Sequence, residues 1–338
     1  MKALVVCKDM GSANMIGPIA QAVQDMGHEV FPVLEGLSVV RWPEMCGVPA
    51  ISITGAPPAI LQEYRPDVVV VGTSFPSNLE KELARAAQGS GIPVVVVEDF
   101  WGGFRRLWLL RPPNLVLTLD QYSARLVREE FGSESSVVVV GNPGVKLGVN
   151  PAPEVMSMRT EGNLVITFCG GGYETAEQIQ LLIQCLERTS KRWRLIPRWH
   201  PKHVSQPDPE NGNRPYQETW DALLERLGDR VVRVDGPSTE SVAVAPDIFV
   251  AGFSTLLTTA AKAGVAAAAL VTPKVQKSLQ EESGLSQVPQ VELGAAHLVM
   301  DPIDLASLRP CSKEVRARLI PLNPVVGAEA ICALVGSR

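Results

Sequence analysis

Two of the three runs of four consecutive valines, those at residues 68–71 and 94–97, constrain the fold of this chain more than any other feature. A strand with one solvated face alternates apolar and polar residues, whereas a strand covered on both faces is apolar throughout. Valine also favours extended backbone because its branched side chain is restricted in a helix. The two runs therefore predict central strands of a parallel sheet that helices cover on both faces.

Further apolar runs, among them the third valine run at 137–140, alternate with helical patterns along the chain. Strands are expected at residues 4–6, 29–33, 115–117 and 137–140, with a weaker pattern at 50–53, and helices at 15–26, 59–64, 78–88 and 121–130. A second series follows, with strands at 164–168, 193–196, 231–234, 248–250 and 267–271 and helices at 175–187, 221–227, 240–244, 255–263 and 327–334. Alternating strands and helices predict an α/β fold of two Rossmann-like, doubly wound parallel-sheet domains facing across a cleft.

The domain boundary is expected after Gly141-Asn142-Pro143-Gly144, where turn residues end the first series. We assign residues 1–145 to an acceptor domain, 146–162 to an irregular linker and 163–338 to a donor domain. The C-terminal helix belongs to the donor domain in this division, and the alternative is that it packs back on the first domain.

Composition limits the partners. The 338 residues are 46% hydrophobic and carry a net charge of −5, which supplies apolar material for two cores and no general positive field for nucleic acid. The six cysteines form no C-x-x-C pair, so no zinc site is expected, and no signal-peptide pattern occurs. We expect a cytoplasmic monomer or homodimer. No apolar run reaches the roughly 20 residues of a membrane helix, and peripheral membrane contact through a surface patch stays open.

Polar residues follow the expected strands of the first domain, where open α/β sheets bind ligands. Gly11 allows a tight turn after the first strand, and Ser12 and Asn14 are candidates to line the substrate site or, alternatively, to cap the helix. Ser74 offers a hydroxyl after the first valine run, although a cap by Ser77 is the simpler interpretation of that turn.

Glu98 and Asp99 directly follow the second valine run and precede an aromatic and glycine-rich turn. Neighbouring side chains of an extended segment point in opposite directions, so one of the two is expected to face the ligand. A carboxylate in a partly dry site has a raised pKa and can act as a general base. We predict Asp99 as this base, with Asp9 as the alternate and Glu98 as the structural neighbour, or the reverse assignment of the pair. In the alternative, one acid caps the turn and the other pairs with Arg105 or Arg106.

Three turns of the second domain offer donors to a phosphate. Each follows a strand, and two of them open a helix, where free N–H groups attract anions. The residues are Gly170, Gly171, Gly172 and Tyr173 in the first turn, Arg198, His200, Pro201 and Lys202 in the second, and Phe253, Ser254 and Thr255 in the third. Tyr173 is expected to stack on a base or to pack. The alternative is a set of surface turns and ordinary helix caps.

His200-Pro201 followed by Ser254-Thr255 is similar to the HP and S-S/T motifs of bacterial sialyltransferases and Kdo transferases. The two-domain layout resembles the GT-B glycosyltransferases and the related UDP-N-acetylglucosamine 2-epimerases. This resemblance implies that His200, Ser254 and Thr255 contact the phosphate of a nucleotide-sugar donor.

The resulting hypothesis is a glycosyltransferase that moves a sugar, with inversion, from a nucleotide-sugar to a hydroxyl of a sugar, lipid-linked or small-molecule acceptor. No Asp-x-Asp occurs, so we expect no metal, and the nucleotide-sugar is a substrate with no separate cofactor. The alternatives are a nucleotide-sugar 2-epimerase or hydrolase on the same scaffold and a non-catalytic nucleotide- or sugar-binding protein.

Overall fold

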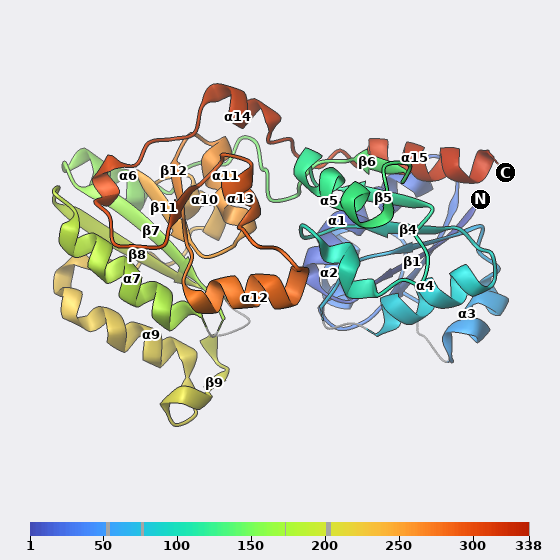
Figure 1. Ribbon diagram of the computed structural model, residues 1–338, viewed down its shortest axis with the longest axis horizontal. Helices are drawn as coiled ribbons and strands as arrows, with labels where there is room; N and C mark the ends of the chain where they lie inside the picture. Colours follow the sequence, from blue (N-terminus) through green and yellow to red (C-terminus); the bar gives the residue numbers. More distant parts are fainter. Residues whose placement is uncertain (52–54, 76–77, 173, 201–203, 338) are drawn as a thin grey trace. The chain divides into compact units, whose positions relative to one another are not determined.

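The computed structural model describes residues 1–338 except 52–54, 76–77, 173, 201–203 and 338, and leaves out the side chains of Arg41 and Glu282. The chain forms two compact units (Figure 1). Unit 1 contains Met1–Pro143, Glu282–Gly284 and Ile320–Arg338, and unit 2 contains Gly144–Glu281 and Leu285–Leu319.

Unit 1 is built on a parallel sheet of six strands in the order β2-β1-β3-β4-β5-β6. The strands are β1 (Lys2–Cys7), β2 (Glu29–Leu34), β3 (Val68–Val71), β4 (Val94–Val97), β5 (Leu115–Thr118) and β6 (Val137–Val139). The valine runs at 68–71 and 94–97 are central strands with every residue buried, as the sequence predicts, because helices cover both faces of this sheet. The third valine run gives the edge strand β6, whose residues are half-buried.

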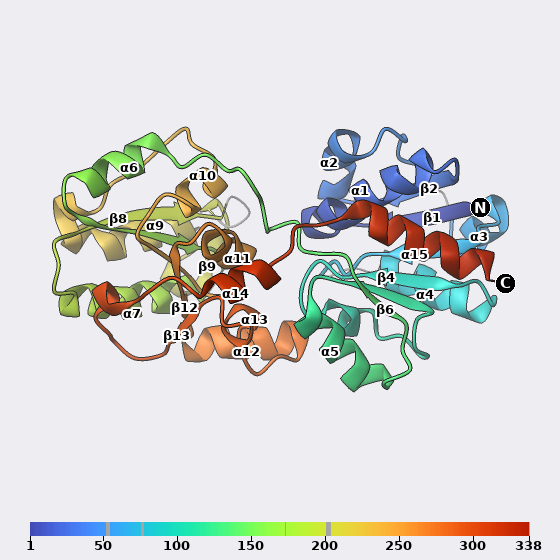
Figure 2. The same ribbon diagram turned by 90° about the horizontal axis from the view of Figure 1, so that it is seen from above.

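The helices of unit 1 pack in pairs on its sheet. They are α1 (Met10–Asp25), α2 (Leu37–Met45), α3 (Pro57–Tyr64), α4 (Leu79–Gly89), η1 (Gly103–Leu107), α5 (Gln121–Phe131) and α15 (Pro324–Gly336). Helix α1 packs against α15 and α3 packs against α4, and the two pairs lie on opposite faces of the sheet (Figures 1 and 2). The C-terminal helix thus completes unit 1 although it is the last element of the chain.

Unit 2 has a parallel sheet of five strands in the order β13-β12-β11-β7-β8. The strands are β7 (Leu164–Gly170), β8 (Trp193–Trp199), β11 (Ile248–Ala251), β12 (Ala266–Leu270) and β13 (His297–Val299). Side chains alternate between two cores: Ile166 and Phe168 pack on one face, and Val165 packs on the other.

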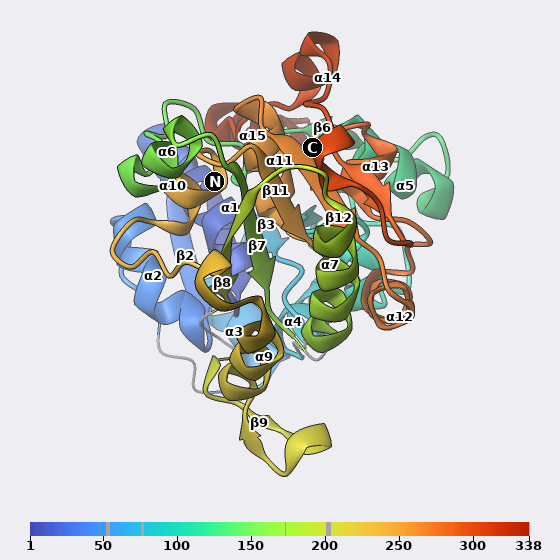
Figure 3. The ribbon, with the colours of Figure 1, turned by 90° about the vertical axis from the view of Figure 1, so that its left-hand side faces the viewer.

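The remaining elements of unit 2 surround this sheet. They are α6 (Pro153–Thr160), α7 (Thr175–Arg188), α9 (Tyr216–Leu224), η3 (Glu225–Arg230), α10 (Thr239–Ala243), α11 (Thr255–Lys262), α12 (Pro273–Ser283), α13 (Pro289–Glu292), η4 (Leu305–Ser307) and α14 (Lys313–Arg318). Helices α7 and α9 pack together, and below them an excursion of β9 (Pro207–Asp208), η2 (Pro209–Asn211) and β10 (Arg214–Pro215) extends from the sheet (Figure 3).

Two sequence expectations are wrong. The segment 146–162 is not irregular throughout, because α6 forms within it and buries Val155 against the second core. Residues 231–234 form no strand: Val231 makes one isolated bridge to Leu195, and the chain then leaves the sheet. The pattern at 50–53 yields only a bridge between Ile51 and Val33, and residues 52 and 53 lie outside the described part.

Candidate functional site

The strands of unit 1 end on a cluster of carboxyl and hydroxyl groups. Asp9 follows β1 and caps α1, because its Oδ1 accepts a hydrogen bond of 2.9 Å from the Ser12 N–H. Its Oδ2 accepts a further bond of 3.3 Å from the Phe75 N–H. The helix is therefore capped by Asp9, and neither Ser12 nor Asn14 has that role. Half-buried Asn14 lies in the next turn of α1.

Asp99 follows β4 and lies close to the start of α1. A side chain at Gly11 would overlap the Asp99 Oδ2 atom, so glycine at this position permits the approach. The Thr73 hydroxyl donates to Asp99 Oδ1, and the Asp99 N–H donates to the same hydroxyl oxygen at 3.3 Å. The carboxylate is held in one orientation and remains partly exposed.

Burial and the charge of Asp9 raise the pKa of Asp99 to about 6, while the Arg106 guanidinium and the Thr73 hydrogen bond act in the opposite direction. A carboxylate with this pKa is ionised at pH 7 and accepts a proton more readily than an ordinary aspartate. Arg106 lies between two aromatic rings, at 5.4 Å from the ring centre of Phe75 and 5.3 Å from that of Phe100.

Glu98 points away from Asp99 into the protein. It is fully buried, and the Ser123 hydroxyl hydrogen bonds to its Oε2. Burial raises the pKa of Glu98 to about 8, although the Ser123 hydrogen bond lowers it in part. The carboxyl group is therefore mostly protonated at pH 7, and its position suits a structural group.

Ser12 and Ser74 are buried and form the floor of the cluster. The Ser74 hydroxyl donates to Glu80 Oε1 at 2.8 Å and accepts from the N–H groups of Lys8 and Asp9 at 3.2 and 3.0 Å. The Ser12 hydroxyl accepts from the Thr73 N–H at 3.1 Å. The geometry assigns Ser74 to the scaffold that joins β1 to β3, where we had expected a substrate-binding hydroxyl. Ser77 lies outside the described residues.

In unit 2 the glycine-rich turn follows β7. The His200 N–H donates to the Gly170 carbonyl at 2.8 Å, and a side chain at Gly171 would overlap the His200 Cβ atom. Gly172 has φ +111°, and a side chain there would come within 2.5 Å of Glu174 Oε2. The turn thus brings exposed His200 beside the glycines, and it also holds the buried acid Glu174.

Arg198 has a different position from the one expected for a phosphate ligand. Its Nη1 donates to the Val234 carbonyl at 2.6 Å and its Nη2 to the Pro237 carbonyl at 3.0 Å. The guanidinium therefore fixes the loop that follows the bridge between Val231 and Leu195 of β8, and both of its terminal nitrogens donate to backbone carbonyls. Tyr173, Pro201 and Lys202 lie outside the described residues.

The turn between β11 and α11 contains Phe253, Ser254 and Thr255, all half-buried. Ser254 is the helix cap, with its hydroxyl accepting from the Leu256 N–H at 3.3 Å. Two glutamines reach this turn from other elements, and no local sequence pattern indicates either contact. Gln290 Nε2 donates to the Ser254 carbonyl at 3.0 Å, and Gln178 extends its amide over Gly252.

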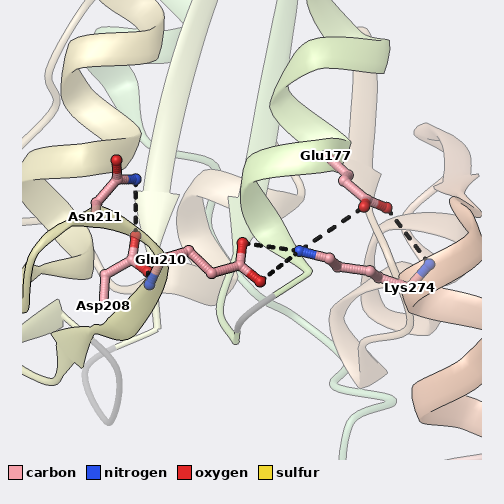
Figure 4. A network of polar contacts seen from close by, with 5 residues as sticks. All are labelled: Glu177, Asp208, Glu210, Asn211 and Lys274. Carbon is pink, nitrogen blue, oxygen red and sulfur yellow. Dashed lines mark hydrogen bonds and ion pairs between the residues drawn. The ribbon is translucent and has the colours of Figure 1, made fainter.

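A polar network fixes the β9–β10 excursion near α7 and α12 (Figure 4). Lys274 Nζ contacts both carboxylate oxygens of Glu210 at 3.0 and 3.1 Å and lies 3.8 Å from Glu177 Oε1. Asp208 turns the excursion by accepting from the Glu210 N–H and from Asn211. These groups are paired with one another, and we assign them to the scaffold.

The described residues contain no group of three or more His, Cys, Asp or Glu side chains placed to hold a metal ion. None of the helices described is long and apolar enough to cross a membrane.

Comparisons with known proteins show likeness in structure only. No family model matches the chain, and no curated protein sequence matches it. The Staphylococcus aureus MnaA–UDP structure has a TM-score of 0.62 at 14% identity, covering 98% of this chain and 94% of that one. A Methanocaldococcus jannaschii UDP-GlcNAc 2-epimerase with UDP-GlcNAc and UDP gives 0.61 at 13%, covering 99% and 100%. The Streptomyces nogalater glycosyltransferase SnogD gives 0.56 at 15%, covering 99% and 100%.

Each of these matches spans nearly the whole of both chains, and identities of this size establish the fold alone. Together with the two parallel-sheet units, they show that this chain has the GT-B fold, as the sequence resemblance predicts.

Proposed function

We propose that this protein is an enzyme that acts on a nucleotide-sugar, and more specifically a glycosyltransferase with Asp99 as its general base. The observation that carries the proposal is the arrangement around Asp99: a partly exposed carboxylate, oriented by Thr73, with a pKa of about 6 at the carboxyl end of β4. Structures of the same fold hold UDP or UDP-GlcNAc, which supports a nucleotide-sugar as the ligand class.

In the proposed reaction, Asp99 takes the proton of the acceptor hydroxyl as its oxygen bonds to the anomeric carbon of the donor sugar. The bond from that carbon to the phosphate oxygen breaks, and its electron pair leaves with the nucleotide. Approach from the face opposite the leaving group inverts the anomeric centre. Developing charge on the phosphate needs donors in place of a metal ion.

The donors we propose for the phosphate are His200 and the turn of Ser254 and Thr255 at the start of α11. Helix α11 directs its free N–H groups at this turn, and buried Gln178 places an amide nitrogen there that has no hydrogen-bond partner in the described part of the chain. The glycine-rich turn carries Glu174 and is better suited to the hydroxyl groups of a ligand, because carboxylate oxygens accept hydrogen bonds from hydroxyls.

Binding and turnover test the proposal in order. A thermal-shift screen with CMP, UDP, GDP, CDP and their sugars should identify a nucleotide that raises the unfolding temperature. With that donor, Asp99→Asn should lower turnover by about 10²-fold or more while nucleotide binding persists. Glu98→Gln, a matched change of the adjacent buried acid, should retain most of the activity. Failure of every nucleotide to bind would refute the proposed function, and an active Asp99→Asn would refute the base.

A nucleotide-sugar 2-epimerase is the second candidate. Solved UDP-GlcNAc 2-epimerases match this chain with TM-scores of 0.57 to 0.63, and the glycosyltransferases match it with 0.55 to 0.59. An epimerase would convert the sugar with no acceptor present, which NMR of the incubated donor detects directly. A donor that binds and stays intact with every acceptor offered would indicate a binding protein.

A further inference from the structure

A short loop after η1 exposes two large apolar side chains at its tip. Leu110 is 81% exposed and Trp108 is 70% exposed, the two highest values for large apolar side chains in the described part of the chain. Arg111 and Pro112 continue the exposed stretch, and Leu109, between Trp108 and Leu110, is half-buried. We call residues 108–112 the tryptophan loop. Single exposed apolar residues are ordinary, but this pair lies on a loop whose conformation is tightly held.

The backbone of the tryptophan loop is strained at its aromatic residue. Trp108 has φ +49° and ψ +48°, the left-handed conformation that a bulky side chain rarely adopts. Two hydrogen bonds from the Arg85 guanidinium to the Trp108 carbonyl hold it there, one of them 3.1 Å long. Such strain persists where the surroundings impose it, and it recurs at functional sites.

The loop is also tied to α4 at its other end. Arg111 Nη2 donates to the Gln88 carbonyl at 2.6 Å, and Gln88 Nε2 donates to the Arg111 carbonyl at 2.8 Å. Two points of α4, one turn apart, therefore fix the loop with its apolar tip outward. A flexible loop would let Trp108 and Leu110 fold back onto the protein, whereas this loop presents them to the solvent.

Three cations lie near the apolar tip. Lys81 Nζ is 5.9 Å from the centre of the Trp108 ring, Arg85 donates to the Trp108 carbonyl, and Arg111 is part of the loop itself. Within the described part of the chain, no carboxylate forms an ion pair with any of the three. The whole chain carries a net charge of −5, so this local excess of positive charge runs against the general field of the molecule.

We propose that the tryptophan loop docks unit 1 on an anionic phospholipid surface, with Trp108 and Leu110 at the boundary of the acyl chains and the three cations among the headgroups. Tryptophan prefers this boundary because its ring is apolar and its N–H is polar. Basic residues near an anionic leaflet add to the binding. The tip is too small for a stable protein–protein interface, which buries about 800 Å² on each partner.

The proposed docking does not depend on the proposed reaction. It does place Arg106, which lies beside Asp99, two residues before the membrane contact. Docking of this kind is peripheral and reversible, because a few side chains and one loop provide it.

Vesicle flotation tests the proposal with the full chain. We expect binding to vesicles of 30% phosphatidylglycerol in phosphatidylcholine at low salt, with little on phosphatidylcholine alone and loss at 0.5 M NaCl. The double change Trp108→Ala with Leu110→Ser should reduce binding at least tenfold. Arg111→Gln should reduce it about fivefold, the contribution expected of one basic residue near the surface.

Matched control variants distinguish the effect of the loop from that of any exposed apolar side chain or any exposed charge. Leu147→Ser removes an apolar side chain that is 67% exposed in unit 2, and Arg226→Gln removes an exposed charge there, and both should bind as the wild type does. Trp108→Gly should weaken vesicle binding, by less than the double change does, without lowering the unfolding midpoint, because glycine adopts the left-handed backbone freely. Brominated lipids should quench fluorescence in the wild type and not in Trp108→Phe.

Three results would overturn the proposal. The first is no binding to the anionic vesicles at low salt, and the second is equal binding by the loop variants and the wild type. The third is concentration-dependent self-association that the loop variants abolish while vesicles have no effect, which would identify a second copy of this chain as the partner. Nucleotide binding measured in parallel reports on the proposed function separately.

Discussion

The pKa of Asp99 depends on its burial and on three neighbours. Burial and the charge of Asp9 favour the protonated carboxyl group, whereas the Arg106 guanidinium and the Thr73 hydroxyl favour the carboxylate. A general base must be ionised, so kcat/KM should rise as the pH passes about 6 and level off above it.

Thr73→Val should move this rise to higher pH, because it removes a hydrogen bond to the charged form and keeps the side-chain shape. The measurement is kcat/KM between pH 5 and 8.5, with ¹³C NMR titration of the carboxyl group as a readout independent of turnover. A rise that stays in place or moves to lower pH in Thr73→Val would contradict this account of Asp99.

Glu98 makes stability depend on pH in a direction opposite to that of a salt-bridged acid. Its pKa is about 8 in the folded protein and about 4.5 when unfolded, so the folded state holds the proton more tightly. The stabilisation is complete below about pH 4.5 and is lost as the pH rises towards 8. Glu98→Gln keeps a neutral side chain at all pH values, so its free energy of unfolding should fall less between pH 5 and 8.

Urea unfolding at pH 5, 6.5 and 8 measures this difference. Glu129→Gln, a change of an exposed acid on α5, should leave the slope of the wild type unchanged. Parallel slopes for the wild type and Glu98→Gln would mean that Glu98 is ionised inside the protein.

Among the site residues, the sequence predicts the orientation of adjacent side chains but not contacts between distant segments. Adjacent Glu98 and Asp99 were expected to diverge because extended backbone requires it, and one is buried while the other is partly exposed. The partners of Arg198 are carbonyl groups on a distant loop, and the approach of Asp99 to Gly11 spans 88 residues of sequence. Neither contact has a local pattern, since both arise only when strands pair.

At the scale of elements, strands β3 and β4 were predictable because a strand that is buried on both faces has a purely apolar sequence. Helix α6 was not, because its apolar side is narrow and it starts at Pro153, which we interpreted as a sign of irregular chain. Residues 231–234 have the valines of a strand but follow η3, and tertiary context leaves them a single bridge.

The β9–β10 excursion depends on Lys274 for its position. Lys274→Met should increase hydrogen exchange of amides in residues 209–214 several-fold, because both contacts to Glu210 are lost. The free energy of unfolding should change by about 1 kcal/mol or less, since Glu210 is largely exposed. Lys277→Met, which removes an exposed pair with Glu281 on the same helix, is the control and should not alter exchange there. Unchanged exchange in Lys274→Met would show that the excursion is held by its own turns.

At the scale of the whole molecule, two βα series predict two parallel sheets, and the chain has both. Sequence order does not show that Ile320–Arg338 belongs to unit 1. Helix α15 is apolar on most of its surface, so its pattern does not specify a single packing face. Its partner is decided by shape: Gly327 lies close to Ile19 of α1, where a side chain would come within 3.1 Å of the Ile19 Cδ1 atom.

The last helix should therefore stabilise the first unit. Ile331 on α15 is 1% exposed, and Ile331→Ala should destabilise unit 1 by roughly 2–5 kcal/mol through the cavity that it leaves. Hydrogen exchange in moderate urea should show loss of protection in α1 and unchanged protection in α7, since α1 packs on α15 and α7 belongs to unit 2. Glu329→Ala removes an exposed side chain of the same helix and should alter neither. Equal loss in α1 and α7 would mean that the two units unfold as one, because a cavity confined to unit 1 can lower protection in unit 2 only if their unfolding is coupled.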